Sequence, residues 1–235
     1  MAVIVCKKFR MRKILLLLGI AVWVQLTNDS RAGDFSVKIA DKEPPNQIGE
    51  SVRKTLRPKA VQLLNGDKPV FEFWFGSEVS LKSKPASADK ALGSIQETTL
   101  LGAVSVGNGQ RDYKDNEVAA GIYTMRFGLQ PQDGDHLGSA EYPYFAVLIP
   151  AKNDTQLDGI TTFKAMTKAS GKDTASGHPV VLSLRPISSD TGDFPKLNEP
   201  VAEHKSVRVK VPAKAGEEKT GIAFELVYKG HGHIQ

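Results

Sequence analysis

The stretch KAVQLLNGDKPVFEFWF, residues 59–75, decides the fold. It holds two runs of strand-forming residues, Lys59–Leu64 and Val70–Phe75, with Asn65-Gly66-Asp67 between them. Asn-Gly between two such runs is the strongest short-range signal for a β-hairpin, because both turn positions tolerate a positive φ. The sequence therefore predicts an antiparallel hairpin at this point of the chain.

The second strand of the hairpin has two different faces. Phe71, Phe73 and Phe75 share one side of it, since successive side chains of a strand point to opposite faces. We expect this triple-phenylalanine face in the hydrophobic core. Trp74 lies on the other face, where we expect burial in a second apolar layer; an exposed stacking surface is the alternative.

Strand signals recur along the rest of the chain, and only one helix is expected, over Leu157–Ala169 with Asp158 as its N-cap. Ser188–Pro200 is polar and contains proline, which is typical of a loop. The further strands are expected at Phe35–Ala40, Thr98–Val106, Ala120–Leu129, Phe145–Ile149, His178–Ile187, Lys205–Val211 and Gly221–Tyr228. This pattern predicts an all-β protein, an antiparallel β-sandwich with at most one short helix; jelly-roll and immunoglobulin-like arrangements both remain open.

The first 32 residues have the order of a secretory signal peptide: basic residues, then the apolar run Ile14–Leu26, then Ser30-Arg31-Ala32. We expect cleavage near Ala32 and a periplasmic or extracellular mature protein. An uncleaved anchor is the weaker alternative, because the apolar run is shorter than the roughly 20 residues that span a bilayer. The expected organisation is a signal peptide (1–32), an extended lead-in (33–57) and a single β-sandwich domain (58–235).

The leader also carries the excess of positive charge. The chain has 31 basic and 26 acidic residues, and residues 1–32 hold six of the former and one of the latter. The mature chain therefore has no net charge, which argues against a nucleic-acid partner. The single cysteine, Cys6, lies in the leader too, so disulfides, thiolate nucleophiles and cysteine-bound zinc are excluded from the mature chain.

The densest polar motif is QPQDGDH, residues 130–136, directly after an expected strand. Asp133 and Asp135 flank a glycine, so the chain can turn sharply and aim two carboxylates at one point. Oxygen ligands of this kind suit calcium, and His136 would also permit zinc. The alternative is an ordinary turn, in which the aspartates bind their own backbone.

Other candidate residues are scattered. His231 and His233 could chelate a transition metal from the C-terminal tail, whereas His178 and His204 are isolated. The sequence contains no Gly-x-Ser-x-Gly nucleophile motif, and no spacing brings Glu72 and Glu225 together as a pair of catalytic carboxylates. These observations favour a protein without catalytic activity.

The strand Ala120-Gly121-Ile122-Tyr123-Thr124-Met125-Arg126 and the loop from Leu129 to Gly138 resemble uncharacterised exported proteins of environmental, planctomycete-type bacteria. This resemblance extends over about Phe71–Pro186, and its central segment is distinctive. It implies that the QPQDGDH loop is a family signature, and it supplies no catalytic residues. The Ala-Gly-x-Tyr strand is also similar to that of transthyretin-like sandwiches, in keeping with the expected fold.

The sequence therefore predicts an exported, non-catalytic β-sandwich that acts as a binding or envelope-associated module. One alternative is a metal-binding protein or metal-dependent hydrolase built on Asp133, Asp135 and His136, with calcium or zinc as its cofactor. Another is a carbohydrate-binding module that uses Trp74 or Tyr113 as a stacking surface; a cell-envelope or polysaccharide ligand is the expected partner. No nucleic acid and no stable membrane anchor are expected after cleavage.

Overall fold

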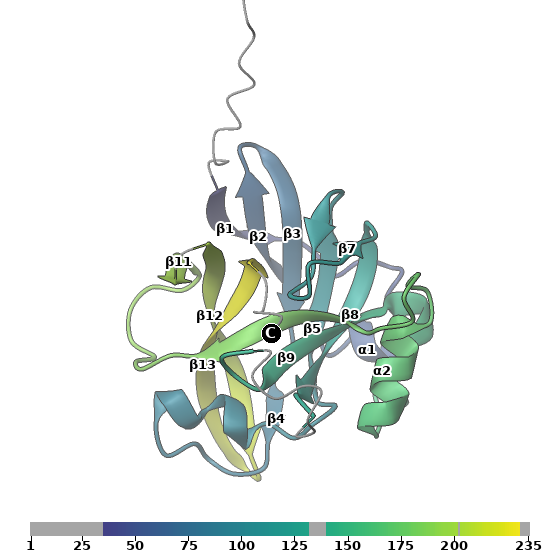
Figure 1. The fold of residues 1–235 in the computed structure, drawn as a ribbon. Helices are drawn as coiled ribbons and strands as arrows, with labels where there is room; N and C mark the ends of the chain where they lie inside the picture. The colour runs from purple at the N-terminus through teal and green to yellow at the C-terminus, as the bar shows by residue number, and fades with distance from the viewer. Residues whose placement is uncertain (1–34, 132–139, 202, 231–235) are drawn as a thin grey trace, which may run out of the picture. The chain divides into compact units, whose positions relative to one another are not determined.

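The computed structural model describes residues 35–131, 140–201 and 203–230, which form a β-rich unit (Figure 1). Its two α-helices are α1 (Glu50–Arg53) and α2 (Phe163–Gly171). Its strands are β1 (Phe35–Asp41), β2 (Lys59–Asn65), β3 (Lys68–Phe75), β4 (Val79–Leu81), β5 (Leu100–Val106), β6 (Gln110–Arg111), β7 (Glu117–Val118), β8 (Gly121–Leu129), β9 (Tyr144–Pro150), β10 (Val180–Pro186), β11 (Lys196–Val201), β12 (His204–Ala215) and β13 (Glu218–Lys229). Because α2 is the only helix of the described residues with more than four residues, the expected all-β class with at most one short helix is confirmed.

Eleven of the strands form one sheet, in the order β1-β2-β3-β5-β8-β9-β10-β13-β12-β11, with β4 added beside β12. Every neighbouring pair is antiparallel except β4 and β12. The predicted hairpin is present as β2 and β3, with Val61 opposite Phe73. The small strands β6 and β7 pair only with each other.

The pairing of β4 shows that the sheet curls back on itself. Only residues 76–78 separate β4 from β3, yet β4 pairs with β12 near the far end of the strand order. A sheet whose third strand leads directly to its far end must be strongly curved. The ring of Phe75 accordingly lies 6.3 Å from that of Phe224 on β13. The two layers of strands that face each other across the core are therefore two halves of one sheet.

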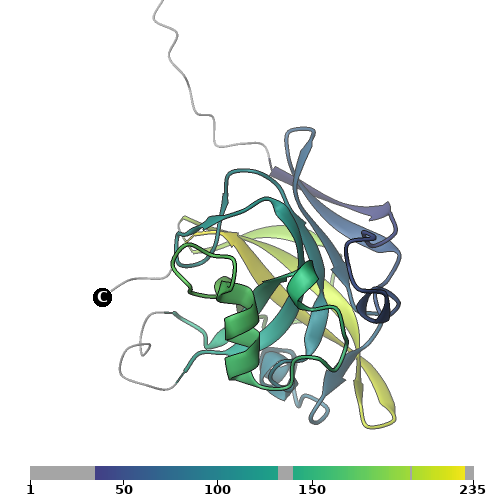
Figure 2. The ribbon, with the colours of Figure 1, turned by 90° about the vertical axis from the view of Figure 1, so that its right-hand side faces the viewer.

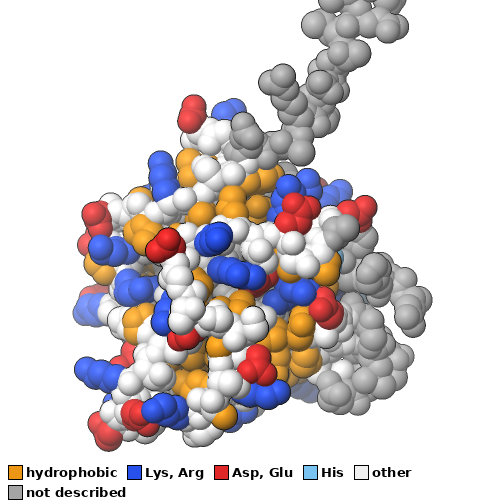
Figure 3. All heavy atoms as spheres, turned by 90° about the vertical axis from the view of Figure 1, so that its left-hand side faces the viewer, with side chains coloured by type: hydrophobic (Ala, Val, Ile, Leu, Met, Phe, Trp, Pro, Cys, Tyr) orange, Lys and Arg blue, Asp and Glu red, His pale blue; other side chains and the backbone are white. Residues whose placement is uncertain are grey.

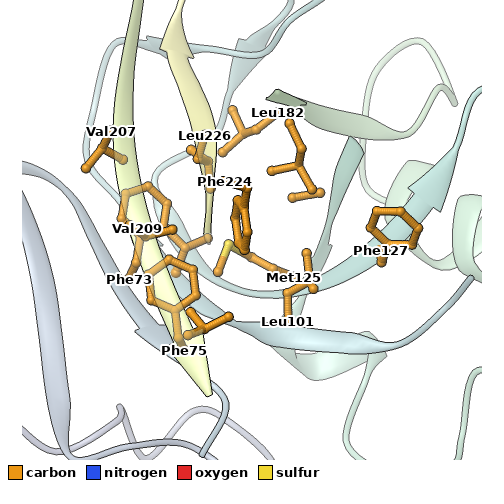
Figure 4. Close-up of a cluster of buried hydrophobic side chains, with 14 of the residues drawn as sticks. Phe73, Phe75, Leu101, Met125, Phe127, Leu182, Val207, Val209, Phe224 and Leu226 are labelled. Carbon is orange, nitrogen blue, oxygen red and sulfur yellow. The ribbon is translucent and has the colours of Figure 1, made fainter. Parts of the chain in front are cut away.

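The main core fills the inside of this curl (Figure 4). Phe71, Phe73 and Phe75 all lie in it, and their rings stack in a row at centroid distances of 5.6 and 6.1 Å. The predicted core face of the hairpin is thus confirmed. Met125 and Phe224 reach the same core from β8 and β13.

A second apolar layer covers the outer face of β2, β3 and β5. Trp74 is fully buried there, together with Ile48 and with Val52 of α1, and its indole Nε1 donates a hydrogen bond to the carbonyl oxygen of Lys42 at 2.9 Å. The expected burial of Trp74 is confirmed. Residues 33–57, expected as a lead-in, contain β1 and α1, and the compact unit begins at Gly33.

A third apolar layer lies on the outer face of β8, β9 and β10, where α2 packs (Figure 2). The helix begins at Phe163, with Thr162 as its N-cap accepting a hydrogen bond from the Ala165 amide. The expected start with Asp158 as N-cap is wrong. The carbonyl oxygen of Leu157 accepts a hydrogen bond from the Arg126 guanidinium instead, which holds this segment outside the helix.

Ser188–Pro200 was expected as a loop, and this prediction is wrong at its end, because β11 begins at Lys196. This strand pairs on one side only, with β12, and ends the sheet. An edge strand tolerates Pro200, whose nitrogen cannot donate a hydrogen bond, so the proline did not exclude a strand.

The face in Figure 3, the side of the unit away from α2, shows apolar, basic and acidic side chains interspersed. Among the described residues, no helix is long and apolar enough to cross a membrane.

Candidate ligand-binding pocket

A pocket of about 260 Å³ lies on the outer face of the sheet beside α2. It is formed by five segments of the chain: the loop after β6, the end of β8, the strand β9, the helix α2 and the start of β10. Its described lining residues are Lys114, Gly128, Leu129, Gln130, Pro131, Phe145, Val147, Phe163, Thr167, His178, Pro179 and Val181.

The floor of the pocket is apolar. Phe145 and Val147 of β9 and Val181 of β10 belong to the outer apolar layer, because the residues between them face the core inside the curl. Gly128 of β8 adds no side chain to this surface. A Cβ at this position would lie 2.9 Å from Val147 Cγ2 and 3.2 Å from Met166 Cε, so glycine allows α2 to approach the sheet.

One wall is a tight loop, residues 112–116, between β6 and β7. The carboxylate of Asp112 accepts hydrogen bonds from the backbone amides of Lys114 and Asn116, both at 2.9 Å. Burial raises the pKa of the Asp112 carboxyl, while these hydrogen bonds act in the opposite direction. The amide of Tyr113 donates to the carbonyl oxygen of Val181 at 2.9 Å, which fastens the loop to β10.

The rim of the pocket is polar and carries positive charge. Lys114 and His178 are exposed there, and Lys114 forms no ion pair with any residue that the structure describes. None of the described lining residues is an aspartate or glutamate. An apolar floor beneath such a rim can hold an apolar group and leave a polar end at the surface.

The pocket lies where the predicted metal-binding loop begins. Gln130 and Pro131 are the first two residues of the QPQDGDH motif and line the pocket. Asp133, Asp135 and His136 lie outside the described residues, so the metal site stays a prediction. Within residues 35–131, 140–201 and 203–230, no three His, Cys, Asp or Glu side chains are grouped so that they could hold a metal ion.

The histidines predicted as isolated residues lie in different surroundings. His178 is exposed at the pocket rim, whereas His204 is buried with its ring centroid 5.8 Å from that of Tyr113. His231 and His233 lie outside the described residues. Of the described histidines, only His178 lines the pocket.

The two glutamates considered for acid–base chemistry do not meet. Glu72 accepts hydrogen bonds from Gln62 and Lys42, and Glu225 accepts them from Asn198, Ser206 and Arg208. Their strands, β3 and β13, are separated in the sheet by β5, β8, β9 and β10. Each carboxylate is buried in its own network of donors, which is a structural arrangement and not a catalytic pair.

The aromatic residues considered for sugar stacking are both covered. The exposed fraction of Trp74 is 0 % and that of Tyr113 is 6 %. Neither ring offers a face to a ligand in solution. The carbohydrate alternative therefore loses the two residues on which it was based.

Sequence reasoning missed the pocket as a whole. Its residues come from the ends of separate elements, and no single segment has the pattern of a binding motif. The one local signal was Gly128, a glycine inside a strand of large side chains, which can mark a close approach of another element.

No protein-family model matches the chain, and no curated protein or solved structure matches it either.

Proposed function

We propose that this chain is an exported, non-catalytic binding protein, and that the pocket beside α2 holds a small apolar ligand or the apolar part of a larger one. The observation that carries the proposal is the apolar floor formed by Phe145, Val147 and Val181, walled by α2 on one side and the loop of residues 112–116 on the other. The order of residues 1–32 supports export.

The volume of the pocket limits the size of the ligand. Its 260 Å³ lie just below the usual range of about 300–1,000 Å³ for small-molecule sites. An aromatic ring with a short chain, or a medium-length alkyl chain, suits such a space. Burying about 200 Å² of apolar ligand surface contributes about 5 kcal/mol before the costs of association, so affinities in the micromolar to millimolar range are expected.

Calorimetric titration of the purified mature protein with 4-phenyl-1-butanol tests this proposal. The variant Thr167→Phe fills the pocket from the helix side, and we expect it to weaken binding at least tenfold. Lys168→Phe places the same side chain on the next residue of α2, which is exposed and outside the lining, and should bind as the original protein does.

Thermal unfolding of each variant shows whether it is folded, and Thr167→Leu serves as a smaller filling substitution if Thr167→Phe is not. Equal binding by the folded Thr167 and Lys168 variants would place the ligand elsewhere and overturn the assignment of the pocket. No heat of binding from the original protein at millimolar ligand would overturn the proposed function itself.

A further inference from the structure

We propose that the ligand of this pocket is a monocarboxylate, whose apolar body lies beneath α2 and whose carboxylate pairs with the ammonium group of Lys114 at the rim. This inference rests on the proposed function and adds the chemical class of the ligand. It is carried by the position of Lys114, by the absence of acidic residues among the described lining residues, and by the apolar floor.

The backbone of Lys114 is held in place before any ligand arrives. Its amide donates to the Asp112 carboxylate, and the amide of Asp112 donates to the Asn116 carbonyl oxygen at 2.9 Å. Asp115 completes the turn with a φ of 62°. Because the neighbouring Tyr113 is bound to β10, the base of the lysine side chain stays beside the pocket. A preorganised group loses less conformational entropy when it binds.

No carboxylate of the described residues pairs with the charge of Lys114. Other lysines among the described residues have a carboxylate beside them, as in the pairs Lys210–Asp190 and Lys84–Glu218. Lys114 has no such partner among the described residues, and its own loop uses Asp112 to bind backbone amides. His178 is the only other ionisable side chain among the described lining residues, and it carries no negative charge.

The chemistry of the lining favours a single negative charge. One ammonium group above an apolar floor matches a carboxylate on an alkyl or aryl body. A phosphate monoester would bring a larger charge and more acceptor atoms than one lysine can satisfy. An amine would place like charges together at the rim and is therefore disfavoured.

Three ligands share the same phenylbutyl body and differ in their polar end: 4-phenylbutyrate, 4-phenyl-1-butanol and 4-phenylbutylamine. Comparing their affinities separates the contribution of the charge from that of the apolar contact. Titrated calorimetrically into the mature protein at low salt, the carboxylate should bind about tenfold more tightly than the alcohol, and the amine most weakly. The advantage of the carboxylate should shrink at high salt, because ions screen a pair at the rim.

The variant Lys114→Gln should abolish the preference for 4-phenylbutyrate over the alcohol. Lys164→Gln is the matched control, since Lys164 is an exposed lysine of α2 outside the lining, and it should change neither affinity.

The outcomes distinguish this inference from the proposed function. If the alcohol binds and the carboxylate binds no better, or if Lys114→Gln leaves the preference intact, the carboxylate assignment is overturned and the apolar pocket stands. If none of the three compounds binds to the folded protein, both proposals fall.

Discussion

At the scale of single residues, a buried ion pair fixes the loop that leads to α2. Arg126 of β8 and Asp154 have side chains that are 3 % and 0 % exposed, and the guanidinium donates to both carboxylate oxygens at 2.7 and 2.9 Å. Thr124 donates to the same carboxylate, and Arg126 also binds the carbonyl oxygens of Thr98 and Leu157. The network joins β8 to the segments around Thr98 and Leu157.

Replacing Asp154 with asparagine should lower the free energy of unfolding by about 3–5 kcal/mol, because it leaves the buried Arg126 charge uncompensated. Urea unfolding of the purified protein measures the change. The exposed pair Glu50–Lys54 provides the control: Glu50→Gln should cost less than about 1 kcal/mol. A loss of similar, small size for both variants would contradict this account of the network.

A second prediction at this scale concerns Tyr228 of β13. Burial, together with the charge of Glu199, raises the pKa of Tyr228 to about 12, whereas an unfolded tyrosine has a pKa of about 10. The folded state therefore retains this proton after the unfolded state has released it. The contribution to stability is complete below pH 10 and is lost as the pH rises toward 12.

Unfolding free energies measured from pH 9 to 12 should therefore decrease above pH 10, with Tyr228 contributing at most about 1.4 kcal/mol per pH unit. The variant Tyr228→Phe should show a shallower decrease. Part of the decrease in the free energy of unfolding should remain in this variant, because burial also raises the pKa of Tyr113 and of Tyr123. The same slope in both proteins would show that Tyr228 does not contribute.

At the scale of elements, the seating of α2 on the sheet creates the pocket. Met166 of the helix is fully buried against the outer layer, and Ser170 accepts a hydrogen bond from the Val180 amide at 2.9 Å. The helix approaches β8 at Gly128, where a larger residue has no room. The distance between helix and sheet, and with it the depth of the pocket, depends on that glycine.

Gly128→Ala should therefore destabilise the protein by about 1–2 kcal/mol, because the added methyl group overpacks the contact with Val147 and Met166. Amide hydrogen exchange should accelerate in α2 more than in the β12–β13 hairpin. Gly121→Ala is the matched control in the same strand, since the nearest atom to its Cβ lies at 3.6 Å. If the two substitutions had equal effects, the claim that Gly128 sets the approach of α2 to the sheet would be contradicted.

At the scale of the whole molecule, Gly33–Gln235 forms one compact unit, closed by the pairing of β4 with β12. The unit begins just after the predicted cleavage site. Without residues 1–32 the chain has no net charge and no cysteine, so no disulfide can stabilise it, and the three apolar layers form its core.

Production of the full chain in a bacterium with a secretory pathway should yield an exported protein that begins just after Ala32. Mass spectrometry of the periplasmic or secreted fraction measures this start. Leu17→Asp interrupts the apolar run and should leave the full-length chain inside the cell. Export of that variant, or an uncleaved chain in the membrane, would contradict the signal-peptide assignment.

The local parts of the fold were predictable from the sequence. The Asn-Gly turn and the alternation of phenylalanines identified the hairpin, its core face and the covered face of Trp74. The strand expected at Gly221–Tyr228 lies within β13 for the same reason. Alternation and turn chemistry are properties of neighbouring residues, so the sequence by itself determined the strand-rich class and the faces of individual strands.

The tertiary structure alone decided how these strands close and where a ligand fits. The start of α2 depends on Arg126, which lies on the distant strand β8 and donates a hydrogen bond to the carbonyl oxygen of Leu157. The pocket exists because Gly128 admits the helix and because the loop of Lys114 is fastened to β10. Contacts between residues far apart in the chain leave no periodic pattern in the sequence, and their energies depend on the packing of the folded protein.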